Sequence, residues 1–164
     1  MRLKLNFHLI FVFLCALMLT IMPLPNVFVS FRPPWVLLVL LYTQFYLPNY
    51  FSLIVTVILG ISMDVLLSTI LGQHVLALII PAWIASGRTR RFHIFSMSQQ
   101  LLLLTLLCFI YQLVLYLIDS YQGFNHTLLM MLATTLTSLM VWPWVNLLLS
   151  RFFNPGVQNR EKFI

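Results

Sequence analysis

Prolines and short polar clusters divide this chain into long apolar segments. Between residues 33 and 87 the acidic and basic side chains are Asp64 and His74, and between residues 92 and 150 only Asp119 and two histidines interrupt. A backbone in hydrocarbon must satisfy its hydrogen bonds within its own segment, so each apolar segment is expected to form a helix. The pattern therefore predicts six transmembrane helices, over residues 6–22, 34–47, 50–71, 74–86, 97–118 and 127–149.

The composition is typical of a membrane protein. Of the 164 residues, 62% are hydrophobic and 7% are charged, whereas soluble domains carry about 25% charged residues. We expect one all-α membrane domain over residues 1–164, with a short basic cytoplasmic tail at 150–164 and an uncleaved first span. The second and fourth segments are short for a full crossing, so the sequence leaves open whether each one crosses or is re-entrant.

The distribution of basic residues predicts the orientation. If all six segments cross, eight of the nine basic residues collect on one side, which is expected to be the cytoplasm. These residues are Arg2, Lys4, Arg88, Arg90, Arg91, Arg151, Arg160 and Lys162. Both termini are therefore predicted to be cytoplasmic, and Arg32 to be on the outer side.

The cluster of Arg88, Arg90 and Arg91 has two interpretations. It is a plain topology signal, or it binds anionic lipid headgroups or an acidic cytoplasmic partner. No basic face with interleaved aromatic residues indicates a nucleic-acid partner.

A row of small or polar residues recurs at every fourth position of the third segment. Its members are Ser52, Thr56, Gly60, Asp64, Ser68 and Gly72. Because residues four apart are neighbours on a helix surface, the row favours close approach of another helix. Gly72 is expected to end this helix and to open the turn to the fourth segment.

Asp64 is the conspicuous member of this row. An acid at the bilayer centre costs about 2.5 to 3.5 kcal/mol, so an interaction must offset that cost. Three interpretations stay open. Asp64 clamps helices through Gln112, His74 or a backbone carbonyl, or it belongs to a proton or ion relay, or it meets a polar group of a partner subunit.

Polar positions on two further segments predict links between helices. One band on the sixth segment comprises Thr134, Ser138, Trp142, Asn146 and Ser150, and another on the fifth comprises Thr105, Cys108, Gln112, Tyr116 and Asp119. We expect both bands to face an interior shared with the third segment. Several aromatic rings are expected at the membrane interface, namely Trp35, Tyr121, Trp142 and Trp144.

The sequence lacks catalytic and metal-binding signatures. It has no HExxH, GxSxG or GxxxxGK motif, and Cys15 and Cys108 lie in apolar runs without metal-ligand spacing. His74 and Asp119 both fall on the predicted outer side, but in different loops, and no spacing supports an acid–base pair. We therefore expect no enzyme activity, no catalytic or metal-binding residues and no cofactor.

Four motifs follow one another in an order that resembles a known family. They are Ile21 to Pro25, Phe31 to Tyr42 with its Arg-Pro-Pro-Trp entry, Gly60 to Asp64 followed by Leu71-Gly72, and Val141 to Trp144. Together they resemble the rod shape-determining protein MreD family of Gram-negative bacteria. The residues that we expect to serve helix packing or partner binding are Gly60, Asp64, Ser68, Gly72, Arg32, Trp35, Gln112, Trp142 and Trp144.

This resemblance implies a non-enzymatic multi-pass subunit of the bacterial inner membrane. It implies binding to the single-span protein MreC and, through it, association with the actin-like MreB, the glycosyltransferase RodA and a penicillin-binding transpeptidase. It also implies a helix arrangement similar to the S-components of energy-coupling-factor transporters.

We interpret the chain as a scaffold that binds MreC and helps to position lateral peptidoglycan synthesis. The alternative is a small-molecule-binding or transport subunit that resembles an S-component. A second rival, a membrane enzyme, would need a nucleophile or a metal cluster facing one compartment.

Overall fold

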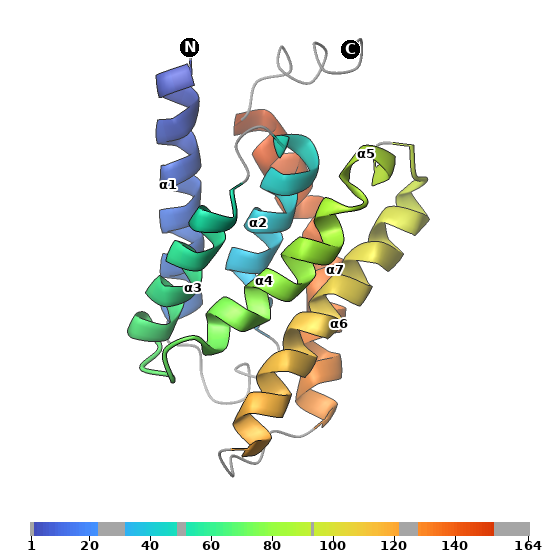
Figure 1. Cartoon of the computed structure of the whole chain (residues 1–164). Helices are drawn as coiled ribbons and strands as arrows, with labels where there is room; N and C mark the ends of the chain where they lie inside the picture. Colours follow the sequence, from blue (N-terminus) through green and yellow to red (C-terminus); the bar gives the residue numbers. More distant parts are fainter. Residues whose placement is uncertain (1, 23–31, 49–51, 93, 122–127, 153–164) are drawn as a thin grey trace.

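The computed structural model describes residues 2–22, 32–48, 52–92, 94–121 and 128–152. Each of the six apolar segments contains one helix, and a single-turn helix, α5, was not predicted. The helices are α1 (Arg2–Ile21), α2 (Trp35–Tyr46), α3 (Leu53–Leu66), α4 (Gln73–Ser86), α5 (Thr89–Phe92), α6 (Met97–Tyr121) and α7 (Leu128–Phe152) (Figure 1). Among the described residues the all-α prediction is confirmed.

The helices form an upright bundle with two distinct ends. Helix α1 begins and α7 ends at the same end as α5, which we call the terminal end (Figure 1). The turn between α3 and α4 and the end of α6 lie at the opposite end, which we call the distal end. Two described helices are long and apolar enough to cross a membrane, Met97–Tyr121 and Met131–Arg151, and four apolar helices are shorter.

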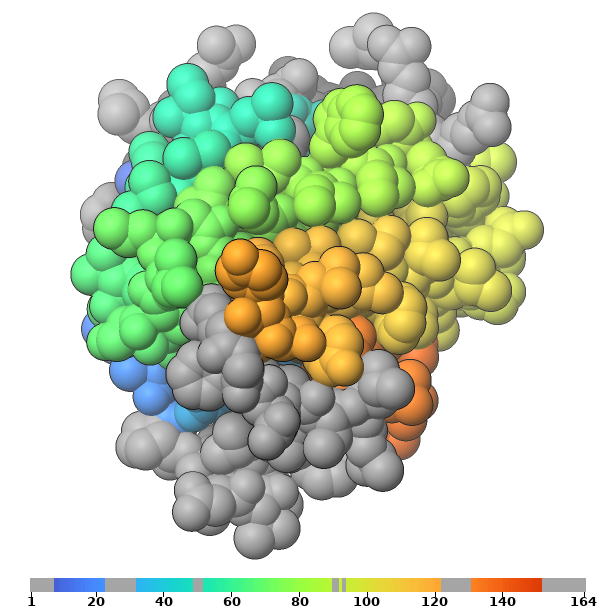
Figure 2. Space-filling view, turned by 60° about the horizontal axis from the view of Figure 1, so that its bottom comes forward, coloured from blue at the N-terminus to red at the C-terminus, as the bar shows by residue number. Residues whose placement is uncertain are grey.

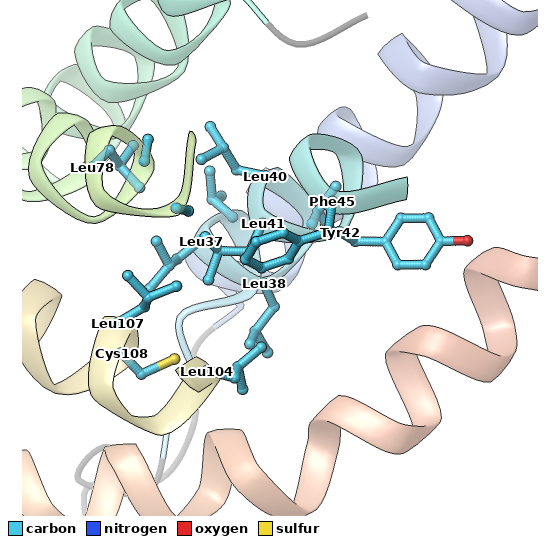
Figure 3. Packing of buried hydrophobic residues seen from close by; sticks show 14 of the residues in the cluster. Leu37, Leu38, Leu40, Leu41, Tyr42, Phe45, Leu78, Leu104, Leu107 and Cys108 are labelled. Carbon is cyan, nitrogen blue, oxygen red and sulfur yellow. The ribbon is translucent and has the colours of Figure 1, made fainter. Parts of the chain in front are cut away.

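Helix α2 forms the centre of the bundle. All ten residues from Val36 to Phe45 are buried, and leucines from α4 and α6, among them Leu78 and Leu104, lie around it (Figure 3). Its 12 residues extend about 18 Å, less than the hydrocarbon thickness of a bilayer. Because other helices surround α2, it carries apolar residues on all sides, with Thr43 and Gln44 as its buried polar residues.

Helices α3, α4 and α6 lie side by side (Figure 2). Pro81 lies inside α4 and is fully surrounded by protein. One turn of the same helix is linked to α2, because the buried amide Nε2 of Gln44 donates to the carbonyl oxygen of Ala82 at 2.7 Å. A polar link of this kind in an apolar interior fixes how the two helices are rotated against each other.

The boundary between α3 and α4 differs from the prediction. Helix α3 ends at Leu66 rather than at residue 71. Ser68 has a φ of 53°, and the N–H of Thr69 donates to the carbonyl of Asp64 at 3.0 Å, so the chain leaves the helix through a left-handed residue. Gly72, with a φ of 99°, is the N-cap of α4 rather than the residue that ends α3.

Candidate functional site

Asp64 lies near the end of α3 and is almost completely buried, with 1% of its surface exposed. Both carboxylate oxygens accept hydrogen bonds from the backbone that follows. Oδ2 accepts from the N–H of Gly72 at 2.7 Å, and Oδ1 accepts from the N–H of His74 at 2.9 Å. The carboxylate therefore closes the turn that joins α3 to α4.

The same carboxylate caps the N-terminus of α4. The N-cap residue, Gly72, has no side chain that could accept a hydrogen bond from the first turn. The first N–H groups of a helix lack partners inside the helix and carry a partial positive charge. Asp64 supplies both an acceptor and a negative charge from the neighbouring helix, which offsets the cost of burying an acid.

Two side chains complete the network around Asp64. His74 is 6% exposed, and its Nδ1 lies 2.8 Å from Oδ1 of Asp64. The hydroxyl of Thr69 donates to the same oxygen at 3.2 Å and lies 3.3 Å from Nδ1 of His74. Of the partners expected for Asp64, His74 is in contact with it. The backbone partners are N–H groups rather than a carbonyl, because a carboxylate accepts hydrogen bonds.

A second link lies beside this network at the distal end. Nε2 of Gln73 donates to Oδ1 of Asp119 at 2.6 Å, which joins the start of α4 to the end of α6. The segments that carry His74 and Asp119 therefore do meet, although their spacing in the sequence did not predict it. In the part of the chain that the structure describes, no group of three or more His, Cys, Asp or Glu side chains could hold a metal ion.

Gly60 marks the closest approach of α3 and α4. A Cβ built on Gly60 would lie 2.6 Å from Cα and 2.7 Å from Cγ2 of Val75. A real side chain cannot occupy that position unless one helix moves, so the two backbones can approach this closely because residue 60 is glycine. Thr56, one turn earlier in the same row, is 0% exposed.

The row of small and polar residues is therefore used inside the chain. Thr56, Gly60 and Asp64 are buried, whereas Ser68 is exposed and lies beyond the end of α3. The expectation that Ser68 and Gly72 continue the helical row is wrong, because the helix ends two residues before Ser68. Gly72 still contributes to the site through its backbone N–H.

Arg32 connects the end of α1 to the entry of α2. Its guanidinium donates from Nη1 to the carbonyl of Thr20 at 2.8 Å and from Nη2 to the carbonyl of Met22. The last carbonyls of a helix lack partners inside the helix and attract cations. Arg32 therefore holds the Pro33-Pro34 segment against the C-terminus of α1.

The remaining predicted site residues lie apart from the network around Asp64. Trp35 is half-buried beside α1 and α7, and Gln112 is half-buried on α6. Trp144 is 76% exposed, as expected for an interfacial ring, but Trp142 is only 3% exposed. The interfacial assignment of Trp142 is wrong, because the ring packs into the same core cluster as α2.

The polar band on α7 faces α6 and α2, whereas α3 packs against α4, so the expected interior shared with the third segment is wrong. Ser138 is 0% exposed and Thr135 beside it is 5% exposed. Further along the band, Nδ2 of Asn146 donates to the hydroxyl of Tyr46 at 3.3 Å, which links α7 to the end of α2.

The basic cluster follows α4 at the terminal end. Arg88 is exposed, and Arg90 and Arg91 belong to α5. Phe92, the last residue of α5, is 0% exposed and stacks on Phe45 with the ring centroids 3.9 Å apart and the planes 2° apart. The segment that carries the arginines is thus anchored to α2.

Sequence reasoning missed several residues that hold these sites. Thr69, Gln73 and Val75 complete the α3–α4 contacts, and Phe92 anchors the basic segment. Thr69 and Gln73 could have been found, because they are polar residues in an otherwise apolar turn next to an acid. Val75 and Phe92 carry no such signal, since one apolar residue resembles the next until the packing is known.

The fold is an apolar bundle with two membrane-length helices, and its described acids are hydrogen-bonded at one end. This is the architecture of a multi-helix membrane protein. The chain belongs to the family of rod shape-determining protein MreD, whose family model matches residues 1–152. It is therefore a polytopic membrane protein of a family that acts in determining cell shape.

A curated relative supports the same assignment. The rod shape-determining protein MreD of Haemophilus influenzae is 31% identical over 147 residues, which cover 88% of this chain and 90% of that protein. No solved structure matches the chain. The expected similarity to S-components in helix arrangement therefore stays a prediction.

Proposed function

We propose that this chain is a non-enzymatic scaffold of the bacterial inner membrane that binds MreC and helps to position lateral peptidoglycan synthesis. Membership of the MreD family supports a role in cell shape. The observation that carries the scaffold proposal is the closed network around Asp64. Its oxygens are engaged by Thr69 and by the backbone of Gly72 and His74, so this acid holds two helices together.

The charge distribution supports an orientation with both termini in the cytoplasm. Arg88 and Arg151 are exposed at the terminal end, and Asp64 and Asp119 lie at the distal end. Basic residues concentrate in cytoplasmic loops of membrane proteins. Arg32, which lies on the distal side, is engaged by the carbonyls at the end of α1 and so serves a structural role there.

We further propose that all six apolar helices cross the membrane. With 25 residues each, α6 and α7 extend about 38 Å, which exceeds the hydrocarbon thickness of about 30 Å. The 14 residues of α3 and of α4 extend only about 21 Å. The turn between them is itself apolar, with Ile70 56% and Leu71 71% exposed, and it lengthens the surface that lipid can cover.

The docking surface for MreC is expected on an outward helix face rather than on the row of small residues in α3. Helices in lipid associate through close packing and polar links, and Thr56, Gly60 and Asp64 already use theirs inside the chain. The row then acts indirectly, because it fixes the bundle whose outer faces meet the partner. Association with MreB, RodA and a penicillin-binding transpeptidase follows through MreC.

The alternative of a ligand-binding or transport subunit has less support. It needs a polar pocket lined by residues such as Asp64, His74 and Gln112. Three grooves on the described surface are lined mainly by apolar side chains of α1, α2, α6 and α7, and those three residues line none of them.

Photocrosslinking to co-expressed MreC tests the proposal. A photoreactive amino acid replaces one exposed residue on each outer face, namely Met18 on α1, Ile58 on α3, Leu76 on α4, Leu102 on α6 and Leu136 on α7. Buried Leu38 is the matched negative control. We expect crosslinks to MreC from one face and none from Leu38. Absence of crosslinks from every face, together with absence of MreC from the purified chain, would contradict the proposal.

A further inference from the structure

We propose that the groove between α2, α6 and α7 at the terminal end binds one anionic phospholipid. The groove has a volume of about 470 Å³. Residues from three helices line it, namely Tyr46, Met97, Gln100, Leu101, Trp142, Pro143, Asn146, Leu147 and Ser150. This inference goes beyond the scaffold function and does not depend on MreC.

A separate groove of about 550 Å³ lies between α6 and α7. Leu101 lines both grooves, whereas Gln100 lines only the proposed lipid site and Leu102 only the separate groove. That second groove serves below as a control.

The lining of the proposed lipid site changes from polar to apolar along α7. Ser150, in the last turn of α7, and Asn146, one turn deeper, carry polar groups, and Asn146 donates to the hydroxyl of Tyr46. Pro143 and Trp142, a further turn deeper, are apolar, and Leu147 lies between the two polar residues. A phospholipid has the same sequence of chemistry, because a polar headgroup is followed by acyl chains.

Positive charge lies next to the polar end of the groove. Arg151 follows Ser150 directly, and both Arg151 and Arg88 are exposed. Neither arginine forms a salt bridge within the described residues. The described acids, Asp64 near the end of α3 and Asp119 near the end of α6, belong to the helix ends at the distal end. The charge therefore favours a headgroup with a net negative charge over a zwitterionic one.

The basic segment is held in place before any ligand binds. Phe92 is stacked on Phe45, and Nε2 of Gln100 donates to the carbonyls of Phe92 and Phe95 at 3.2 and 3.1 Å. Gln100 itself lines the groove. A site that is already ordered loses little conformational entropy on binding, which favours affinity.

A lipid fits this groove better than an acidic protein segment does. Leu147 is 54% exposed and Met97 72% exposed, so the apolar part of the groove opens outward where acyl chains surround the bundle. A water-soluble acidic segment would engage the arginines but would leave this apolar part unfilled.

Native mass spectrometry of the purified full chain tests the inference. The protein in detergent is titrated separately with palmitoyl-oleoyl phosphatidylglycerol and with palmitoyl-oleoyl phosphatidylcholine. One basic residue near a membrane surface changes the affinity for an anionic lipid about five-fold. We therefore expect phosphatidylglycerol to bind about five-fold more tightly than phosphatidylcholine, or more. Equal affinity for the two lipids would overturn the inference.

Variants separate this groove from general lipid binding. Arg88→Gln with Arg151→Gln is expected to remove the preference for phosphatidylglycerol, and Leu147→Trp, which fills the groove, to weaken both lipids. Leu136→Trp fills the groove between α6 and α7 and is the matched control, because Leu136 is also exposed. An unchanged preference in the arginine variant, or an equal loss in Leu136→Trp and Leu147→Trp, would overturn the inference. A hexaglutamate peptide is also added as a competitor. If it displaces the lipid, and does so equally well in Leu147→Trp, the inference is overturned, because that result identifies a peptide site.

Discussion

Asp64 holds His74 twice, since Oδ1 accepts the backbone N–H at 2.9 Å and lies 2.8 Å from the ring nitrogen Nδ1. One carboxylate thereby fixes both the start of α4 and the orientation of its second side chain. In an apolar surrounding an unpaired N–H or carboxylate is costly. This mutual satisfaction explains how a buried acid and a tight turn coexist at the distal end.

Replacing the carboxylate tests its role as a cap. Asp64→Asn keeps the shape of the side chain but puts an NH2 group where one of the oxygens accepts from Gly72 or His74. Leaving a buried donor without a partner costs about 1–3 kcal/mol. We expect a lower thermal unfolding temperature in detergent. Ser68→Ala, an exposed site in the same turn, is the control and should unfold like the unaltered chain.

The contact between Gly60 and Val75 predicts that even one methyl group is harmful. Gly60→Ala would place its Cβ 2.6 Å from Cα of Val75, and overpacking of this kind costs about 1–3 kcal/mol. Gly87→Ala is a matched glycine control, because its Cβ would meet no atom closer than 3.8 Å. Thermal unfolding of the two variants compares them directly, and equal stability would show that α3 can move away from α4 without cost.

A second-site change sharpens that experiment. Val75→Ala removes Cγ2, one of the close atoms, but leaves Cα and the backbone nitrogen, which lie 2.6 and 2.9 Å from the added Cβ. The double variant with Gly60→Ala should therefore regain only part of the lost stability. Full recovery would mean that the side chain of Val75, rather than the backbone approach, requires glycine.

Arg32 is expected to stabilise the α1–α2 connection through its fork of donors. Arg32→Lys keeps the charge but cannot donate to the carbonyls of Thr20 and Met22 in the same geometry. Loss of a charge-assisted hydrogen bond costs about 1.5–3 kcal/mol. We expect faster proteolysis near residue 22 in Arg32→Lys, whereas Arg88→Lys at an exposed site should be unchanged.

The stacked pair of Phe92 and Phe45 anchors the basic segment. Truncating a buried phenylalanine costs about 3–5 kcal/mol, so Phe92→Ala should release this segment. A cysteine placed at Arg88 would then react faster with a water-soluble maleimide. Phe109→Ala, at a ring that is 38% exposed on α6, should leave the reaction rate unchanged.

The sequence predicts the helices well but not how they meet. Among the described residues, hydrophobic runs bounded by prolines identify every helix except the single-turn α5, because hydrocarbon allows few other backbone structures. The importance of Gly60 and Asp64 follows from small and acidic residues at helical spacing. The end of α3 was misplaced, since nothing in the sequence marks Ser68 as left-handed. The burial of Trp142 depends on the path of α7 against α2.

The polar contacts at the distal end also show which pairs a sequence can predict and which it cannot. His74 was within reach of sequence reasoning because both residues are polar in an apolar stretch. The link between Gln73 and Asp119 joins residues that are 46 positions apart. No local pattern relates two such residues, and only the packing of α4 on α6 brings them together.

We propose that the α3–α4 hairpin, held together at Gly60 and Asp64, fixes the bundle on which MreC docks. The most direct test is the amount of MreC recovered per folded chain when tagged Gly60→Ala, Asp64→Asn and Gly87→Ala variants are purified from cells that co-express MreC. We predict that Gly60→Ala and Asp64→Asn lose most of the recovered MreC while Gly87→Ala keeps it. Undiminished recovery with Gly60→Ala and Asp64→Asn would contradict the account.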